Sequence, residues 1–222
     1  MQETLSEIEE LFRIPSPAPV NQALAVDGTN LWMGSLQTQR IYGIDARQGR
    51  VFEENPTPGR PVGACVMGDE LRVVSSEDGE ADNRFIRRYV IGHGFKENHR
   101  VPCPDDTGSF IAYDGDFLYL SQRYNKRILE IDDKGKMIRV VATVALEITG
   151  MTIFGGCFYL ALSGGKDSGV FRITKVDARK PTPEITDLAS IPYEARSLAH
   201  DGQRFWTNQR WDSQIVAFKI PE

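Results

Sequence analysis

Short apolar runs separated by turn-forming residue pairs fill most of the chain, and one arrangement recurs. A small or apolar pair is followed by a turn rich in Asp and Gly and then by an apolar run that often contains aromatic residues. The copies begin at Ala25-Val26-Asp27-Gly28, Val66-Met67-Gly68-Asp69, Ala112-Tyr113-Asp114-Gly115, Ile153-Phe154-Gly155-Gly156 and Ala199-His200-Asp201-Gly202. Asp and Gly accept positive φ at low cost, so these pairs indicate β-hairpins.

The spacing of the turns predicts the architecture. They begin at positions 27, 68, 114, 155 and 201, so successive copies are 41 or 46 residues apart, and five copies use up the 222 residues. A period of about 40–45 residues is typical of the four-stranded blade of a β-propeller. The sequence therefore predicts an all-β protein, a single five-bladed β-propeller; a β-sandwich or an open array of strands is the alternative.

The strand count predicts how the ring closes. Residues 1–222 form one predicted domain, with blades at about 22–62, 63–108, 109–148, 149–195 and 196–222 plus 5–14. The last copy ends after three strands, whereas Glu7–Ile14 is a surplus strand ahead of the first. We therefore expect Glu7–Ile14 to pair beside Gln214–Ile220 and to protect the exposed sheet edge. The alternative is a loose N-terminal arm, favoured by the acidic residues at 7, 9 and 10.

Composition narrows the classes of partner and the location. A net charge of −5 and a pI of about 5.4 argue against nucleic acid, which requires a basic face. No run approaches the roughly 18 apolar residues of a membrane span, and the acidic segment Met1–Phe12 does not resemble a signal peptide. Three cysteines without a Cys-x-x-Cys pair indicate a reducing compartment. We expect a soluble, cytoplasmic protein with no nucleic-acid or membrane partner.

Familiar catalytic and metal-binding motifs are not matched. Gly164–Gly169 lacks the spacing of a phosphate-binding loop. The acidic segment Glu77–Asn83 lacks the EF-hand pattern, because Asn83 stands where Gly is needed and Tyr89 where a bidentate carboxylate is needed. His200 occupies a register position that is apolar in the other copies, which favours a structural role. We therefore predict no cofactor and no metal site.

Two matching segments supply candidate binding residues. Ser121-Gln122-Arg123-Tyr124-Asn125 parallels Asn208-Gln209-Arg210-Trp211-Asp212, and both precede the third strand of a unit. The segments are 87 residues apart, so they form equivalent loops two blades apart. Arginine pairs with carboxylate or phosphate, and an aromatic ring stacks beside it. We expect Arg123, Tyr124, Arg210 and Trp211 on the rim of one face; turn formation with solvated arginines is the alternative.

The residues that lead into the innermost strands are expected to surround the axis on that same face, which we call the axial mouth. They are Asn21-Gln22, Val62-Gly63, Gly108-Ser109, Thr149-Gly150 and Ala195-Arg196. The ring is chemically mixed: some positions carry side chains that donate or accept hydrogen bonds, and the glycines leave space for a ligand. The candidate ligand-binding side chains of the ring are Gln22, Ser109, Thr149 and Arg196.

The repeated units resemble known propeller families. Asn125–Asp132 resembles a blade of the NHL-type, gluconolactonase-like and virginiamycin B lyase-like propellers. Asn21-Gln22-Ala23-Leu24 resembles the Thr-Gln-Gly-Leu segment of the five-bladed glutamine cyclotransferases. The second resemblance implies that Gln22 contacts a ligand at the axis. Met33 stands where that family has a glutamate, so cyclotransferase activity is not implied, and the axial positions lack the carboxylate of a gluconolactonase-like metal site.

Two functions from different classes follow. The first is binding of a small polar or anionic molecule at the axial mouth, with lyase, hydrolase or cyclase chemistry through polarisation by Arg196 left open. The second is a non-catalytic protein–protein interaction module in which Tyr124 and Trp211 anchor a protein partner.

Overall fold

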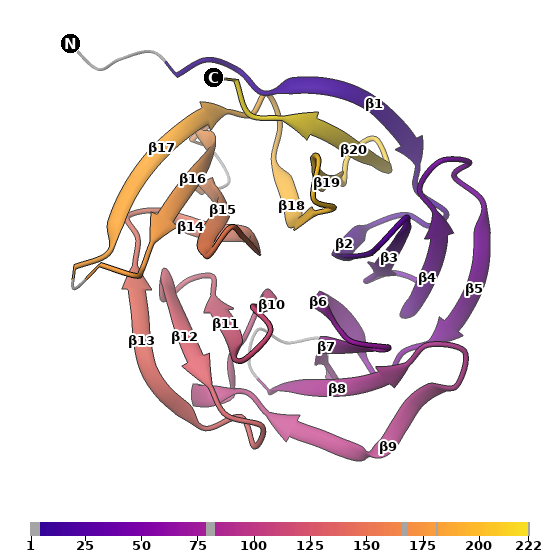
Figure 1. The fold of residues 1–222 in the computed structure, drawn as a ribbon. Coiled ribbons are helices and arrows are strands. Elements are labelled where there is room, and N and C mark those ends of the chain that lie inside the picture. Colours follow the sequence, from indigo (N-terminus) through magenta and orange to yellow (C-terminus); the bar gives the residue numbers. More distant parts are fainter. Residues whose placement is uncertain (1–4, 79–82, 166–167, 181, 222) are drawn as a thin grey trace.

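The computed structural model describes residues 5–78, 83–165, 168–180 and 182–221. Five four-stranded antiparallel sheets surround a central axis, as Figure 1 shows. The predicted five-bladed β-propeller is thus confirmed. The described ranges contain one short helical element, the 3-10 turn η1 (Pro104–Asp106). No helix among these residues is long and apolar enough to cross a membrane.

Each blade is an up-and-down meander whose first strand lies nearest the axis in Figure 1. Blade 1 comprises β2 (Asn21–Asp27), β3 (Asn30–Ser35), β4 (Arg40–Asp45) and β5 (Val51–Pro56). Blade 2 comprises β6 (Arg60–Met67), β7 (Glu70–Ser76), β8 (Arg84–Val90) and β9 (Gly94–Pro102). Blade 3 comprises β10 (Ile111–Tyr113), β11 (Leu118–Gln122), β12 (Arg127–Ile131) and β13 (Met137–Thr143).

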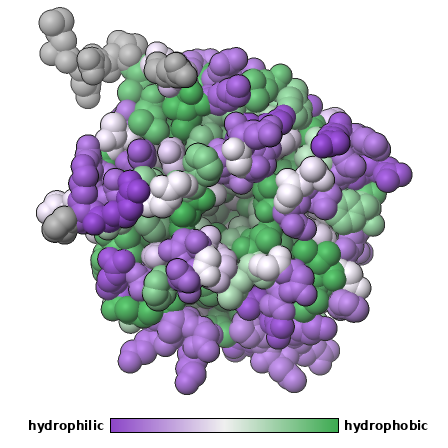
Figure 2. All heavy atoms as spheres, viewed as in Figure 1, coloured by the Kyte–Doolittle hydropathy of each residue, from purple (hydrophilic) through white to green (hydrophobic). Residues whose placement is uncertain are grey.

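Blade 5 is assembled from both ends of the chain. Blade 4 comprises β14 (Glu147–Phe154), β15 (Cys157–Ser163), β16 (Phe171–Asp177) and β17 (Glu184–Ser190). Blade 5 comprises β18 (Ala195–His200), β19 (Phe205–Gln209), β20 (Gln214–Lys219) and β1 (Glu9–Pro15), with β1 on the outside (Figure 1). The inner strands leave an axial channel, and Figure 2 shows the surface hollowed at the centre of the ring.

Ring closure by the N-terminal strand is confirmed, with a shift in its bounds. β1 pairs antiparallel with β20 from Glu9 opposite Lys219 to Pro15 opposite Gln214. Glu7, predicted as part of this strand, instead forms a parallel bridge with Ser190 at the end of β17. The segment before β1 therefore connects blade 4 to blade 5.

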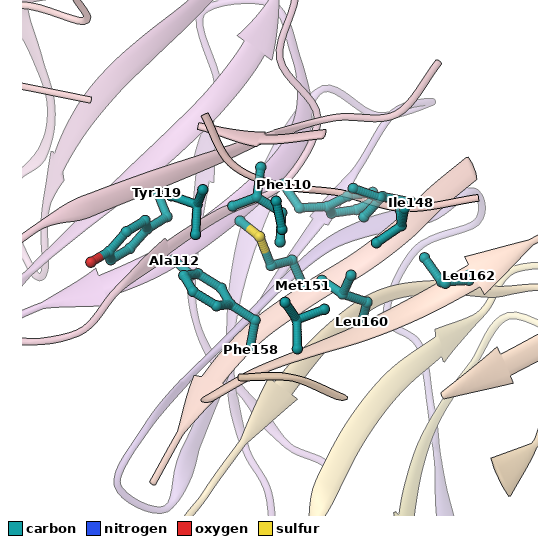
Figure 3. Close-up of a cluster of buried hydrophobic side chains, with 13 residues drawn as sticks. Phe110, Ala112, Tyr119, Ile148, Met151, Phe158, Leu160 and Leu162 are labelled. Carbon is teal, nitrogen blue, oxygen red and sulfur yellow. The ribbon is translucent and has the colours of Figure 1, made fainter. Parts of the chain in front are cut away.

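Apolar clusters between neighbouring blades form the core. Figure 3 shows the cluster between blades 3 and 4, where Phe110 and Met151 are buried among aliphatic side chains. Tyr119 and Phe158 meet edge to face, with ring centroids 4.9 Å apart. Alternating apolar residues point from each sheet toward its neighbour, so every blade is covered on both sides and the ring holds itself together.

Candidate functional site

The innermost strands bulge where they begin at the axial mouth. In blade 1, Asn21 and Ala23 pair with consecutive residues of β3, so Gln22 is an extra residue. Val62 in blade 2 and Thr149 in blade 4 are extra in the same way. A β-bulge bends the strand and re-aims the side chain that it displaces. The Gln22 side chain then spans to the next blade, donating from Nε2 to the Val62 carbonyl over 3.3 Å.

A cavity of about 180 Å³ opens at this end of the ring, and we call it the mouth cavity. Its lining residues are Gln22, Leu36, Arg60, Val62, Ser76, Arg84, Ser109, Phe110, Arg123, Tyr124 and Arg210. Four of these residues are arginines and none is an aspartate or glutamate. The lining therefore differs in charged side chains from the chain as a whole, which carries a net charge of −5.

Arg123 is held in place by carboxylates beyond the cavity. Its Nε donates to Glu147 Oε2 over 2.9 Å, and its Nη2 lies 3.8 Å from Glu194 Oε1. Its backbone N–H donates weakly to Ser109 Oγ over 3.4 Å. The guanidinium carbon is also 5.2 Å from the centre of the Tyr124 ring, within range of a cation–π contact. This arginine is thus oriented before any ligand arrives.

Arg196 lies beside the cavity and is 6% exposed. It forms an ion pair with Glu194, while its Nε is buried without a hydrogen-bond partner among the described residues. Burial lowers the pKa of Arg196, and the positive charge of Arg123 acts in the same direction. Arg196 therefore has an N–H donor, at Nε, that is available to a ligand.

Arg210 is the least satisfied of the three arginines. The ion pairs of the mouth join Arg123 to Glu147 and Arg196 to Glu194, and none of those in the described residues includes Arg210. Its Nε is buried and has no partner in the described part of the chain. Burial, and to a smaller extent the nearby charge of Arg196, lower the pKa of Arg210 to about 10, although the negative charge of Glu194 acts in the opposite direction. Such perturbed, unpaired groups cluster at functional sites.

Because the folded state disfavours the charge on Arg210, we expect Arg210→Met to raise stability. The pKa falls well below that of an ordinary arginine, to about 10, so the penalty is present in full below about pH 10 and disappears as the pH rises above 10 toward the ordinary pKa of arginine. After solvent screening, removal of the charge should add about 1–2 kcal/mol to the free energy of unfolding at neutral pH. Thermal unfolding should show a rise in Tm of about 3 °C or more.

Arg179→Met is the matched control, since Arg179 is exposed and paired with Asp177 over 2.8 Å. That variant should leave Tm unchanged or slightly lower it. A fall in Tm for Arg210→Met would show that Arg210 stabilises the fold instead.

The structure brings five of the predicted binding residues to one cavity: Gln22, Ser109, Arg123, Tyr124 and Arg210. Arg196 lies close to them: it forms an ion pair with Glu194, and the charge of Arg123 acts on its pKa. Thr149 is 1% exposed, and its Oγ1 donates to the Ala161 carbonyl within blade 4, so it is not among the lining residues. Trp211 is 81% exposed on the β19–β20 loop and does not line the cavity either.

Sequence reasoning missed two of the four lining arginines. Arg60 pairs across the sheet with Ser76, and Ser76 pairs with Arg84, so the three form one row across blade 2. Arg84 also donates from Nη1 to the Gly108 carbonyl over 3.1 Å, which ties this row to blade 3. Arg60 and Arg84 are each the first residue of a strand. That position alone does not indicate a binding residue, and only the pairing of the strands shows that the two arginines lie in one row.

The other candidate functional groups do not line the mouth cavity. His200 stacks on Phe154 with ring centroids 3.8 Å apart, and burial lowers its pKa. The three cysteines are free and buried. No group of three or more potential metal ligands occurs among the described residues, and the acidic residues at 80 and 82 lie outside them, as do residues 166–167 of the Gly164–Gly169 loop.

Comparison with known proteins relates the chain to others through its fold. No protein-family model matches it, and no curated protein matches it in sequence. Glutaminyl cyclase from Myxococcus xanthus has a similar structure, with a TM-score of 0.75 at 10% identity over 99% of this chain and 100% of that one.

Two further propellers are similar. The PQQ-bound aldose sugar dehydrogenase from Streptomyces coelicolor has a TM-score of 0.62 at 12% identity, over 97% of this chain and 98% of that one. The calcium-binding protein regucalcin from Agrobacterium tumefaciens has a TM-score of 0.57 at 10% identity, over 98% and 95%. The resemblance to cyclotransferase-like and gluconolactonase-like propellers is thereby confirmed for the fold, and the chain is a five-bladed β-propeller that shares its architecture with both enzymes and a binding protein.

Proposed function

We propose that this protein binds a small anionic molecule in the mouth cavity. The observation that carries the proposal is Arg210, a half-buried guanidinium that no described carboxylate pairs with, in a cavity lined by four arginines and no acidic side chain. A partly desolvated cation that makes no direct ion pair is costly. An anion that enters the cavity removes that cost and gains charge-assisted hydrogen bonds.

The shape and composition of the cavity restrict the ligand further. At about 180 Å³ it is smaller than the pockets of roughly 300–1,000 Å³ that hold drug-sized molecules, which favours a small metabolite. Guanidinium groups match the planar, bidentate geometry of carboxylate and phosphate oxygens. Gln22 and Ser109 add neutral polar contacts at the axis, and Tyr124, 64% exposed at the rim, adds a ring for stacking.

Chemistry on the bound molecule is a second step of the same proposal. Fixed guanidinium groups stabilise negative charge that develops in lyase, hydrolase or cyclase reactions. Arg196 and Arg210 are suited to that role because each has a buried Nε donor with no hydrogen-bond partner among the described residues. Two of the similar propellers are enzymes by name, and one is named a calcium-binding protein, so the fold is compatible with catalysis or with binding alone.

Thermal shift with carboxylates and phosphate esters tests the proposal. A ligand at one hundred times its Kd should stabilise the protein by about 2.7 kcal/mol, a rise in Tm of roughly 5–10 °C. Arg210→Gln should weaken binding by about 10- to 100-fold, the worth of a charged hydrogen bond. The affinity should also fall as the pH rises above about 10, where Arg210 loses its proton.

Arg179→Gln removes the same charge from an exposed position that does not line the mouth cavity and should leave ligand binding unchanged. If no anion raises Tm, or if Arg210→Gln binds as well as the parent, the proposal is wrong. The protein–protein alternative then stands, and substitution of the exposed Trp211 by Ala should weaken capture of its partner.

A further inference from the structure

A second cavity, of about 220 Å³, lies between blades 5 and 1, and we call it the closure cavity. Phe12 of β1, Trp206 of β19 and Leu31 of β3 line it, together with turn residues of both blades. β2 begins at the axial mouth, and Gly28 and Thr29, which follow its far end, line the closure cavity. This cavity therefore lies at the end of the ring away from the mouth, and its lining shares no residue with that of the mouth cavity.

Part of the lining is aromatic and held in a fixed orientation. Phe12 and Trp206 meet edge to face, with ring centroids 5.4 Å apart. Trp206 in turn donates from Nε1 to Asp201 Oδ2 over 2.8 Å. Trp206 is 2% exposed, whereas Phe12 is 39% exposed. Phe12 therefore offers an accessible ring that a buried and anchored indole supports.

Arg204 lies beside these rings and is neutralised by a carboxylate of the same turn. Its guanidinium carbon is 5.6 Å from the centre of the Phe12 ring and 6.0 Å from that of Trp206. Its Nε lies 3.2 Å from Asp201 Oδ2. Burial opposes ionisation of Asp201, but hydrogen bonds from Trp206 and from the backbone N–H groups of Gln203 and Arg204 hold its pKa below the ordinary value. The two charges of this pair therefore balance at neutral pH.

Arg47, on the β4–β5 turn, supplies the charge that remains in the lining. Asp45, which is outside the lining, accepts the backbone N–H groups of Arg47 and Gln48 on Oδ1, over 2.8 and 3.0 Å. The Arg47 side chain is exposed, and no salt bridge within the described ranges includes it. With Arg204 paired to Asp201, the charged side chains of the lining carry one positive charge in excess.

The rest of the lining includes apolar side chains. Leu31 and Trp206 belong to the apolar cluster between blades 5 and 1, and the partly buried Val26 and Ala46 pack against that cluster. An apolar cavity of about 150 Å³ already accommodates benzene. The larger closure cavity therefore has room for a ring that carries a substituent.

We propose that the closure cavity binds a planar aromatic carboxylate. The ring of the ligand packs against Phe12 and the apolar lining, next to the Arg204 guanidinium, and its carboxylate faces Arg47. Aromatic rings favour edge-to-face and offset contacts with other rings, and a planar guanidinium stacks on their faces. The excess positive charge favours an anionic ligand over a neutral one. This site is separate from the mouth cavity and does not depend on anion binding there.

Isothermal titration with 2-naphthoate, its neutral isostere 2-naphthamide and its saturated analogue decahydro-2-naphthoate tests this assignment. We expect 2-naphthoate to bind about 3-fold or more tightly than either analogue. Arg47→Gln should weaken 2-naphthoate by about 3- to 10-fold and leave 2-naphthamide unchanged. Arg50→Gln is the matched control, because Arg50 is exposed on the same turn and does not line the cavity. Phe12→Leu keeps an apolar side chain and should lower the affinity for 2-naphthoate to that for the saturated analogue.

Arg210→Gln separates this inference from the proposed function, since Arg210 lines only the mouth cavity. It should leave 2-naphthoate binding unchanged. If Arg210→Gln weakens 2-naphthoate as much as Arg47→Gln does, or more, the probe binds at the mouth: the inference is wrong, and anion binding at the mouth is supported. If 2-naphthoate does not bind, or binds no better than 2-naphthamide, the inference is wrong and the proposed function is unaffected.

Discussion

Deletion of residues 1–15 should lower the free energy of unfolding by more than about 5 kcal/mol and leave a chain that aggregates instead of melting reversibly. The deletion removes β1 and with it the whole outer strand of blade 5. Ile14 is 5% exposed and packs with Trp206 and Ile215 between blades 5 and 1. Ile8 is equally buried between blades 4 and 5. Loss of either side chain alone typically costs about 2–5 kcal/mol.

The backbone makes the same connection. Ile8 N–H donates to the Ser190 carbonyl over 3.0 Å, and Ser190 N–H donates to the Ser6 carbonyl over 2.8 Å. These bonds attach blade 4 to the segment that completes blade 5. Without the segment, β20 becomes an exposed edge strand, which is a template for pairing with another chain. A loss above 5 kcal/mol is comparable to the whole stability of an ordinary domain.

Circular dichroism melts and size-exclusion chromatography measure this effect, and a peptide of residues 5–17 added in trans should restore folding. Leu11→Ser is the matched control within β1, because Leu11 is 37% exposed, whereas Ile14→Ser removes a buried side chain of the same strand. Leu11→Ser should change Tm little, and Ile14→Ser should lower it strongly. A truncated protein that stays monomeric and melts at the parent temperature would show that the N-terminal strand is dispensable.

The fold was predictable because its signals are local. In the turns after the innermost strands, glycines such as Gly28, Gly155 and Gly156 adopt the positive φ that glycine favours. The strand count then required an N-terminal strand in blade 5, and β1 supplies it. The predicted start was two residues early, because Glu7 leaves β20 and bridges to Ser190 of the neighbouring blade, a contact that no local pattern encodes.

The site was less predictable because it depends on bulges and on register. Alignment of the copies placed Gln22 and Thr149 at equivalent positions, and both are the extra residues of bulges. Their environments still differ: Gln22 lines the mouth cavity, whereas the Thr149 hydroxyl bonds to a carbonyl of its own blade. The row formed by Arg60 and Arg84 exists only through the pairing of three strands, so it could not be found in sequence order.

In two of the bulges, a glycine directly follows the extra residue. Gly63 in blade 2 lies against the backbone at the start of blade 3, and a Cβ built there would meet the Ser109 carbonyl and come within 2.8 Å of Phe110 Cα. Gly150 occupies the same place in blade 4, where a Cβ would lie 2.6 Å from the Ser197 carbonyl oxygen of blade 5. Both neighbours are backbone atoms, which cannot rotate away.

Gly63→Ala should therefore lower the free energy of unfolding by about 3 kcal/mol or more, since one methyl group forces two inner strands apart. Gly68→Ala is the matched control: Gly68 has φ +66° and no atom within 4 Å of a built Cβ, so it tests backbone strain alone and should cost about 1 kcal/mol. Urea denaturation gives both values. Because Ser109 lines the mouth cavity, Gly63→Ala should also weaken anion binding, whereas Gly68→Ala should not. Equal losses of stability in the two variants would show that the inner strands separate freely and that the close approach of blades 2 and 3 does not position the mouth.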